Sequence, residues 1–251
     1  YVAAIRASQL GLKSAVVERD KAGGVCLNIG CIPSKALIHQ AQIFSHIRDL
    51  EAMGVKVDRS GLDYAAVFRK SRAAADRLSR GVASLLKKNR VELIAGTGRI
   101  TGAQEITVDG ARKLRAKNLL VATGSRPREI TGFAIDEKTV LSSTGLLMLE
   151  RLPKSLLVLG AGAIGVEFAY VMNAFGVEVH LVEMLDRILP TEDGEIVAVL
   201  AREFQKRGIR IQTSTRAESL TARGELLEVV LAGKERSTVT VEKVLVAVGR
   251  A

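Results

Sequence analysis

Residues 155–184, SLLVLGAGAIGVEFAYVMNAFGVEVHLVEM, join an apolar run, a glycine-rich turn, an amphipathic stretch and a second apolar run. We expect a strand, a tight turn, a helix and a second strand in that order. Gly160 permits the sharp turn, Gly162 lets a pyrophosphate approach the backbone, and Gly165 allows the helix to pack closely on the strand. The helix N-terminus then presents N–H groups to the phosphates. This stretch predicts a parallel α/β domain that binds a dinucleotide.

An acidic residue closes the second strand of this unit. Glu183 stands where a carboxylate accepts hydrogen bonds from an adenine ribose 2′-hydroxyl and repels a 2′-phosphate. A glycine-rich turn made for packing alone would not explain this acid. The pattern therefore favours NAD over NADP, although Arg187 nearby leaves NADP open.

The start of the chain repeats the second half of this unit. Residues 1–18, YVAAIRASQLGLKSAVVE, align with residues 166–183, and in both a glycine lies seven residues before the closing glutamate, which is Glu18 in the first copy. In this alignment the partner of Gly165 falls directly before Tyr1. We therefore expect a second nucleotide-binding unit whose first strand and glycine loop precede Tyr1, in a sequence that is a piece of a longer protein.

The remaining pattern alternates helices and strands, which predicts two Rossmann-like domains with a boundary after residue 132. We expect a helix from the second cysteine through residues 35–50, a long amphipathic helix near 64–88, short strands within 91–100 and 106–110, a buried strand within 116–127, a short helix ending at Pro153, a helix near 193–206, a strand near 209–213, a meander through 242 and a last strand at 243–249.

Composition describes a globular protein, with 47% hydrophobic and 25% charged residues. The net charge is +10, but the basic residues are dispersed and rarely interleaved with aromatic ones. This favours a solvated basic surface that attracts anionic cofactors over nucleic-acid binding. No apolar run reaches 18 residues, so we expect no membrane span.

Both cysteines lie in GGVCLNIGCIPSKAL, residues 23–37. Residues five apart on an ideal helix are roughly 8–9 Å apart at Cα, whereas a disulfide needs about 4.4–6.8 Å. Cys26 and Cys31 can be bridged only if the backbone between them is irregular, and Gly30 with Pro33 supplies such irregularity. A metal site is disfavoured, because the three histidines lack the required spacing. Two inert buried thiols and a redox pair both remain open.

Cys31 begins a predicted helix, whose dipole stabilises a thiolate at its N-terminus. Lys35 follows one turn later and can add positive charge. A stabilised thiolate suits a redox dithiol. From spacing alone, a solvated lysine on the helix face is the simpler interpretation of Lys35.

The segment 23–37 resembles the redox-active disulfide segment of the class I pyridine nucleotide–disulfide oxidoreductases, most closely that of their dihydrolipoamide dehydrogenase branch. The resemblance covers essentially all 251 residues and continues through VATGSRP at 121–127, the glycine motif and VLVAVGR at 244–250. Ser34 stands where glutathione reductase-like relatives carry a second lysine. Mercuric reductase-like relatives, which would need further cysteines, are the main alternative within the family.

The resemblance implies a partial FAD-binding domain at 1–132 that carries the disulfide, an NAD-binding domain at 133–251 and a C-terminal interface domain beyond Ala251. Cys26 would exchange with dihydrolipoamide, and Cys31 would be the flavin-side sulfur of a Cys26–Cys31 disulfide. Lys35 would lie near the flavin, paired with Glu167.

The resemblance also implies two sets of cofactor-binding residues. FAD would contact Glu18, Lys35, Gly98, Thr123, Gly124 and Ser125. NAD would contact Gly160, Ala161, Gly162, Ala163, Ile164, Gly165, Val166, Glu167, Glu183, Gly249 and, at the end of the third strand, Ala217.

The intact enzyme would thus oxidise dihydrolipoamide through the disulfide and FAD and pass a hydride to NAD. Its partners would be dihydrolipoamide or a lipoyl-carrying protein of a 2-oxoacid dehydrogenase complex, and a second copy in a homodimer. We expect a bacterial-type cytoplasmic protein, with organelle targeting left open because the sequence begins inside a domain. The general base would belong to the C-terminal domain, so residues 1–251 alone are expected to be a poor catalyst. His39, His46 and His180 are expected to be structural. Another FAD/NAD(P) disulfide reductase, or a nucleotide-binding fragment without chemistry, remains an alternative.

Overall fold

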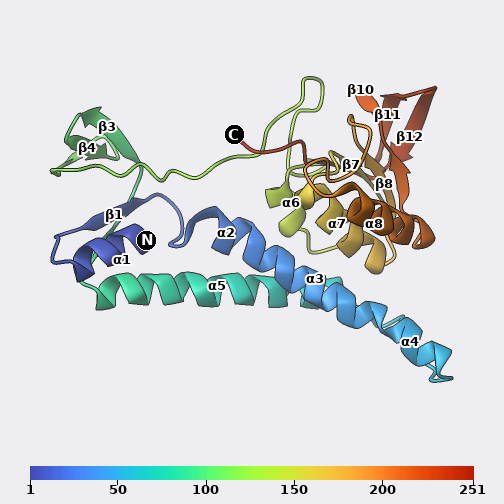
Figure 1. The fold of residues 1–251 in the computed structure, drawn as a ribbon, viewed down its shortest axis with the longest axis horizontal. Helices are drawn as coiled ribbons and strands as arrows, with labels where there is room; N and C mark the ends of the chain where they lie inside the picture. The colour runs from blue at the N-terminus through green and yellow to red at the C-terminus, as the bar shows by residue number, and fades with distance from the viewer. The chain divides into compact units, whose positions relative to one another are not determined.

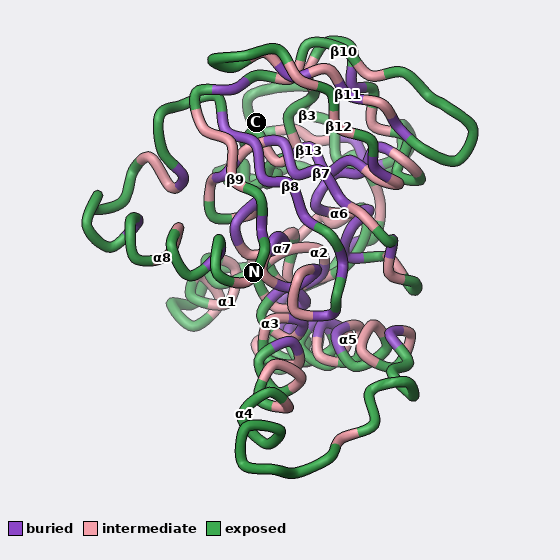
Figure 2. Tube along the Cα trace, turned by 90° about the vertical axis from the view of Figure 1, so that its right-hand side faces the viewer, coloured by how far each residue is buried: buried purple, intermediate pink, exposed green.

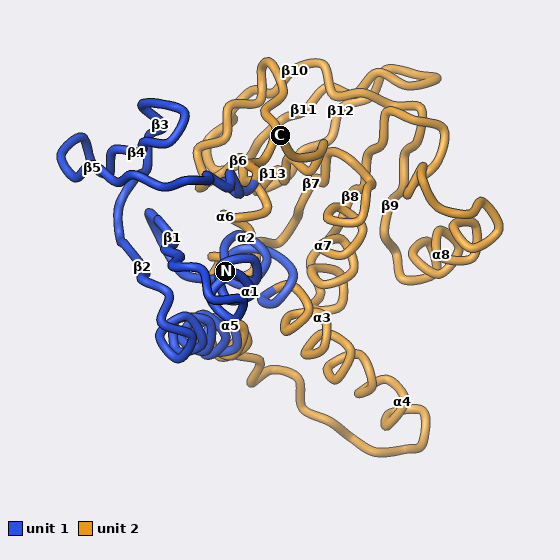
Figure 3. The backbone as a smooth tube through the Cα atoms, turned by 60° about the vertical axis from the view of Figure 1, so that its left-hand side comes forward, with its two compact units in different colours: residues 1–33, 72–124 blue, residues 34–71, 125–251 orange.

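The computed structural model describes residues 1–251 as two compact units, distinguished by colour in Figure 3. Unit 1 comprises residues 1–33 and 72–124, and unit 2 comprises residues 34–71 and 125–251. Residues 34–71 therefore group with the C-terminal half of the chain. The division at residue 132 into two cofactor-binding domains stays a prediction about function.

A five-stranded parallel sheet forms the centre of unit 2, as the sequence predicts. Its order is β6-β13-β7-β8-β9, and Figure 1 labels its strands β7 and β8. The bounds are β6 Val140–Leu141, β7 Ser155–Leu159, β8 Glu178–Val182, β9 Arg210–Gln212 and β13 Lys243–Val246. Three helices connect these strands: α6 Ser143–Leu147, α7 Ala163–Ala174 and α8 Gly194–Lys206. The helix near 193–206 is thus confirmed. The short helix expected to end at Pro153 is present but already ends at Leu147.

The central strands are buried on both faces, which explains why they are continuous apolar runs rather than alternating ones. Figure 2 shows buried backbone concentrated along β7, β8 and β13. In β7, Leu156 and Val158 join a hydrophobic cluster with residues of α7, while Leu157 and Leu159 join a second cluster with residues of a neighbouring antiparallel sheet. Each face of the parallel sheet therefore has its own core.

The antiparallel sheet that covers the second face is the predicted meander. It consists of β10 Arg216–Arg223, β11 Leu226–Ala232 and β12 Arg236–Val241 in that order. Val229 and Leu231 of β11 are fully buried against the parallel sheet.

Residues 34–71 add helices to the first core of unit 2. Helix α3 spans Cys31–Ser45, α4 spans Ile47–Ala52 and α5 spans Tyr64–Lys88. The ring centroids of Phe44 and Tyr64 lie 5.4 and 5.5 Å from that of Phe175. Such aromatic contacts contribute beyond the area that they bury. No helix of the chain is both long enough and apolar enough to span a membrane.

Unit 1 is smaller and has a modest core. It contains α1 Val2–Gln9, β1 Ala15–Glu18, α2 Gly24–Ile29, β2 Glu92–Ala95, β3 Gly98–Gly102, β4 Glu105–Val108 and β5 Arg112–Arg115. Strands β1 and β2 pair in parallel, and β3-β4-β5 form an antiparallel sheet. The core centres on Val82, Leu86 and Val91, with Val16 and Leu27 packed against it.

The predicted buried strand within 116–127 is wrong. This stretch contains no strand, and Leu120 and Val121 are 75% and 62% exposed. The apolar run predicts burial correctly only when a neighbouring strand supplies hydrogen bonds and cover. The parallel sheet of unit 1 consists of β1 and β2 alone, and neither strand pairs with residues 118–124.

Asp136 organises the turn that leads into β6. Its Oδ1 accepts hydrogen bonds from the amides of Lys138, Thr139 and Val140 at 2.8, 2.8 and 2.9 Å, and its Oδ2 accepts one from the Thr139 hydroxyl at 2.7 Å. Desolvation opposes ionisation, but the four hydrogen bonds prevail and hold the pKa of Asp136 well below its usual range. The carboxylate therefore stabilises the folded chain at neutral pH.

We predict that Asp136→Asn lowers the free energy of unfolding at pH 7 by about 1 kcal/mol, because a neutral amide oxygen accepts weaker hydrogen bonds than a carboxylate and the amide nitrogen cannot accept from the Thr139 hydroxyl. The folded pKa lies below the unfolded value of about 3.9, so this stabilisation is complete above that value and disappears as the pH falls through the folded pKa. Urea unfolding at pH 7 and pH 3 should show the difference between wild type and variant shrinking at low pH. The exposed control Asp186→Asn should change little at either pH, and a difference that grows on acidification would contradict the prediction.

Candidate functional site

The glycine turn between β7 and α7 separates glycines that the fold needs from one that it does not. Gly160 has a φ of +100°, and a Cβ there would lie 2.6 Å from the carbonyl oxygen of Ala247. A Cβ on Gly165 would collide with the carbonyl oxygen of Gly160. Gly162 has an ordinary φ of −71°, and nothing lies within 4 Å of a Cβ placed there. Its missing side chain leaves open space at the start of α7, as a bound pyrophosphate requires.

The N-terminus of α7 faces this space without a side-chain cap. Gly162 is the N-cap residue, and the first helical bond runs from the amide of Val166 to the carbonyl of Gly162. The amides of Ala163, Ile164 and Gly165 thus precede the hydrogen-bonded ladder. The helix has 12 residues, long enough for its dipole to favour an anion at this end. This geometry fits the phosphates of a dinucleotide.

Glu183 follows β8 and is buried, with only 8% exposed. Its Oε2 accepts a hydrogen bond from the amide of Ala161 at 2.7 Å, and its Oε1 accepts one from the amide of Leu185 at 2.9 Å. Each carboxylate oxygen can accept a second bond, so ribose hydroxyls can still be bound. The ribose role stays a prediction, whereas the anchoring of the glycine turn by this acid was not expected from the sequence.

Gly249 and Ala217, two further expected NAD contacts, lie in different parts of unit 2. Gly249, with a φ of +114°, follows β13 at the edge of the sheet where β7 ends, because Val246 pairs with Leu159. The placement of Ala217 at the end of the third parallel strand is wrong. That strand ends at Gln212, and Ala217 lies in β10 against the second core. The chain turns out of the parallel sheet over residues 213–215, where Ser214 has a φ of +49°.

Lys35 and Glu167, which are 132 residues apart in sequence, form an ion pair in unit 2. Lys35 Nζ donates to Glu167 Oε1 at 2.5 Å. The Lys35 side chain is 60% exposed, and surface pairs of this kind contribute at most about 1 kcal/mol. Stability alone therefore gives little reason for the pair. Glu167 lies directly after the glycine motif, so the Lys35–Glu167 pair is a candidate functional couple.

The two cysteines of unit 1 lie on either side of a helix break. Cys26 is in α2, Cys31 is the first residue of α3, and both are exposed. Between them Gly30 has φ −148° and ψ −122°, and a Cβ there would lie 2.9 Å from the carbonyl oxygen of Val25. Pro33 cannot donate to the carbonyl of residue 29, so a regular helix could not continue. The predicted irregularity is present, and the alternative of two buried thiols is excluded.

The expected FAD contacts in unit 1 come from several segments. Glu18 ends β1 as Glu183 follows β8, and its Oε1 accepts a hydrogen bond from the amide of Asp20 at 3.0 Å. Gly98 begins β3, and a Cβ there would lie 3.2 Å from the side chain of Val17. Thr123 and Gly124 lie in an irregular stretch, where Gly124 has a φ of +77°. An acid at the end of a parallel strand fits an adenine ribose in both copies of the repeat.

Ser125 belongs to unit 2 and is held by Arg250, a residue that the sequence analysis missed. Arg250 donates from Nε to the Ser125 hydroxyl at 2.8 Å and from Nη2 to its carbonyl at 2.6 Å. The backbones of Arg126 and Ala251 exchange hydrogen bonds of 2.8 and 2.9 Å beside this contact. The only sequence signal was the position of the arginine directly after Gly249.

The three histidines lie in different surroundings. His39 is exposed on α3, and His46 is exposed at the N-cap of α4. His180 is buried in β8, with its Nε2 3.2 Å from Nη1 of Arg210 and 3.5 Å from Oε1 of Glu178. Burial lowers the pKa of His180, the charge of Arg210 lowers it further, and Glu178 opposes both. The burial of His180 fits a structural role, and that role stays a prediction for all three histidines.

We predict that the two alanine substitutions Gly165→Ala and Gly162→Ala have opposite consequences. Gly165→Ala should lower the free energy of unfolding by about 3 kcal/mol, because the methyl group overpacks the contact between α7 and β7. Gly162→Ala should leave stability unchanged or slightly raised, but should weaken NAD binding at least tenfold by filling the space beside the helix N-terminus. Urea unfolding and calorimetric titration with NAD measure the two effects. Equal NAD affinity for wild type and Gly162→Ala would contradict the assignment of this space to the pyrophosphate.

Comparison with known proteins shows the family to which the chain belongs. The family described as "Pyridine nucleotide-disulphide oxidoreductase" matches residues 1–251. Dihydrolipoyl dehydrogenase of Zymomonas mobilis is 43% identical over 99% of this chain and 55% of its own length. Dihydrolipoyl dehydrogenase of Bacillus subtilis is 40% identical over 100% of this chain and 56% of its own length. The chain thus spans about half the length of these curated relatives.

Solved structures show the same architecture. LpdA from Mycobacterium tuberculosis is 26% identical and superposes with a TM-score of 0.88, covering 99% of this chain and 55% of its own. The flavoprotein disulfide reductase RclA from Escherichia coli, described as induced by HOCl, is 26% identical with a TM-score of 0.84, over 99% of this chain and 54% of its own. On the family match over its whole length, the chain belongs to the pyridine nucleotide–disulfide oxidoreductase family.

Proposed function

We propose that the whole protein, of which this chain supplies one part, oxidises dihydrolipoamide or a lipoyl group on a carrier protein, with Cys26 and Cys31 as its redox pair. One observation carries the proposal. Two exposed cysteines flank a helix break in a chain whose relatives at 40–43% identity are named dihydrolipoyl dehydrogenase. A nucleotide-binding fragment without chemistry would not need this exposed pair.

The chemistry of the pair is thiol–disulfide exchange. A thiolate of the dihydrolipoyl group attacks the Cys26 sulfur of a Cys26–Cys31 disulfide, and Cys31 leaves as a thiolate. The second substrate thiol then displaces Cys26, which closes the substrate disulfide and leaves a protein dithiol. Two electrons and two protons pass from substrate to protein. As the leaving group, Cys31 benefits from its place in the first turn of α3.

FAD and NAD are the cofactors that the residues fit. When bound, FAD would supply the acceptor for the electron pair of the dithiol, and NAD⁺ would supply the final hydride acceptor. Glu183, the glycine turn and Gly249 would hold NAD within the proposed domain at 133–251. Within the proposed domain at 1–132, Glu18, Gly98, Thr123, Gly124 and Ser125 would hold FAD.

Several further features of the proposal concern the whole protein. Lys35, paired with Glu167, would fix the flavin edge by charge. A lipoyl-carrying protein of a 2-oxoacid dehydrogenase complex would deliver the substrate, in the cytoplasm. A second copy of the protein would complete a homodimer. The Lys35–Glu167 ion pair supports the first of these features, and the family resemblance supports the others.

We predict that the two thiols of the 251-residue chain disappear together on mild oxidation. With only two cysteines, titration with Ellman's reagent should fall from two thiols to none per chain and return to two after dithiothreitol. Mass spectrometry should show a monomer that has lost two hydrogen atoms. The two exposed cysteines lie on either side of the helix break at Gly30, where the backbone can bring them within disulfide distance. Cys26→Ser should instead oxidise to a disulfide-linked dimer or not at all. A wild-type chain that keeps both thiols, or crosslinks only between chains, would refute the redox pair.

We predict that Glu183→Gln reduces the preference for NAD over NADP by about tenfold or more, since it removes a buried charge that repels the 2′-phosphate. The ratio of the two dissociation constants, measured by calorimetry, is the relevant readout. It is insensitive to the modest loss of stability expected when a side-chain amide faces a backbone amide. Glu195→Gln, on the exposed first turn of α8, is the control and should leave the ratio unchanged. An unchanged ratio in Glu183→Gln would remove this acid from cofactor selection.

A further inference from the structure

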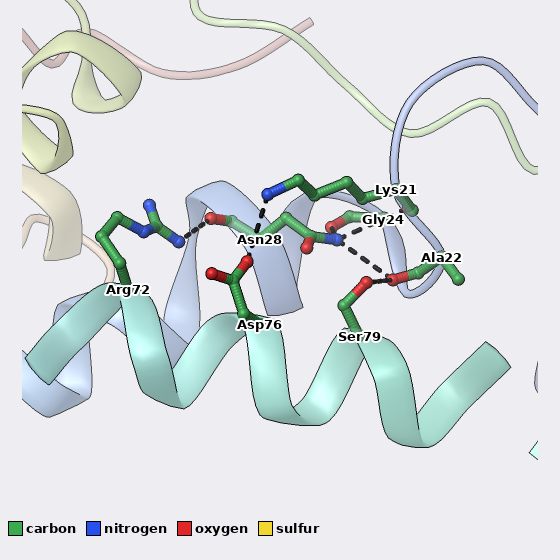
Figure 4. Close-up of polar contacts among 7 residues, drawn as sticks. All are labelled: Lys21, Ala22, Gly24, Asn28, Arg72, Asp76 and Ser79. Atoms are coloured by element: carbon green, nitrogen blue, oxygen red, sulfur yellow. Dashed lines mark hydrogen bonds and ion pairs between the residues drawn. The ribbon is translucent and has the colours of Figure 1, made fainter. Parts of the chain in front are cut away.

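Within unit 1, one face of α5 holds the segment that carries Cys26. Arg72, Asp76 and Ser79 are spaced i, i+4 and i+7, so their side chains lie in one row on the helix. Figure 4 shows all three side chains extending from α5 toward residues 21–28. The sequence analysis assigned no role to any of them.

The start of the segment is fixed by two of these side chains. The Ser79 hydroxyl donates to the carbonyl of Ala22 at 2.7 Å, from a residue that is only 8% exposed. Lys21 Nζ lies 3.1 Å from Asp76 Oδ1, in a solvent-exposed ion pair. The buried hydrogen bond between Ser79 and Ala22 holds the start of the segment more strongly than the exposed Lys21–Asp76 ion pair does.

Asn28, midway between the cysteines, ties α2 back to this start. Its Nδ2 donates to the carbonyls of Gly24, Ala22 and Lys21 at 3.0, 3.2 and 3.5 Å, as Figure 4 shows. The residue is 6% exposed, and its Oδ1 is buried without a hydrogen-bond partner. An unsatisfied buried oxygen costs free energy, and the hydrogen bonds from Asn28 Nδ2 must offset that cost. The orientation of the Asn28 side chain is therefore set by these donated hydrogen bonds.

Arg72 fixes the other end of the segment, where α2 stops. The carbonyl of Asn28 lies in the last turn of α2, one residue before the helix ends at Ile29. Such carbonyls lose their partners when a helix breaks. Arg72 Nη2 donates to this carbonyl at 2.5 Å. Burial lowers the pKa of Arg72 and the charge of Asp76 counteracts this, in agreement with a guanidinium lodged against the segment.

We propose that Arg72 is a positioning residue for the cysteine pair: by capping the broken end of α2 through the Asn28 carbonyl, it holds the break across which Cys26 and Cys31 form their disulfide. The inference rests on the proposed redox function. A dithiol tolerates many backbone geometries at residues 28–31, whereas a disulfide needs its two Cα atoms within about 4.4–6.8 Å. The cap therefore favours the disulfide over the dithiol.

The equilibrium with glutathione measures this preference in the 251-residue chain. The protein dithiol and glutathione disulfide give the protein disulfide and two glutathione thiols, so atoms and electrons balance. Chains equilibrated anaerobically over a range of glutathione ratios are quenched with acid and alkylated, and the oxidised fraction is counted by mass spectrometry. We expect Arg72→Met to lower the equilibrium constant for disulfide formation about tenfold, the scale of a lost hydrogen bond from a charged donor.

Two further variants separate capping from charge and from folding. Arg77→Met removes the same charge from an exposed position of the same helix and should stay within twofold of wild type. Arg72→Lys keeps the charge and one donor, and should fall about threefold, because an ammonium lacks the planar fork of a guanidinium. Circular dichroism identifies folded variants, and Arg72→Lys decides the question if Arg72→Met does not fold.

The outcomes are distinct. Folded variants at Arg72 that oxidise like wild type would overturn the positioning role, and so would an equal loss in Arg77→Met. A wild-type chain that forms no disulfide at any glutathione ratio would refute the proposed function itself, and the inference with it. A loss confined to Arg72, with normal circular dichroism, supports both.

Discussion

The close packing of α7 on β7 is the contact on which the nucleotide site depends. A side chain on Gly165 would strike the carbonyl of Gly160, and one on Gly160 would strike the backbone of Ala247, directly after the neighbouring strand β13. Helix, strand and adjacent strand therefore meet with backbone against backbone. This contact brings the N-terminus of α7 to the carboxyl edge of the sheet, where Glu183 and Gly249 also lie. The proposed nucleotide site depends on the absence of side chains where β7, α7 and β13 meet.

Glu183 gives this arrangement a double character. The same carboxylate that stands where the adenine ribose is expected also accepts a hydrogen bond from the amide of Ala161, inside the glycine turn. In the proposed function, the shape of the glycine turn and the choice between a hydroxyl and a phosphate on the ribose would thus depend on one buried charge. A change of cofactor preference at this position would alter the turn as well, so the two properties cannot be varied independently.

Sequence reasoning recovered most of unit 2 because its signals are local. The glycine spacing and the apolar strands each specify an element without reference to the rest of the chain. Reasoning failed where the outcome depends on a distant partner. The apolar run at 118–124 needs a neighbouring strand, and Ala217 depends on a turn at Ser214 that has no sequence signature.

The contacts of α5 with the segment that carries Cys26, and the contact of Arg250 with Ser125 in unit 2, were also beyond local reasoning. The hydrogen bonds of Arg72, Ser79 and Arg250 all go to backbone carbonyls or hydroxyls of residues more than 40 positions away. Any arginine on an exposed helix face has the same local sequence signal. Only the pairing of Lys35 with Glu167 was anticipated at long range, and it came from the family resemblance rather than from the residues alone.

The alternation along the central strands has a consequence for how this unit can vary. In β7, β8 and β13, neighbouring residues such as Leu156 and Leu157, Leu181 and Val182, or Val244 and Leu245 belong to different cores. Inserting or deleting one residue in any of these strands would exchange the sides of every residue beyond it. Length changes among descendants of this sequence should therefore accumulate in the connecting loops, while the strands keep their lengths even as their aliphatic side chains exchange freely.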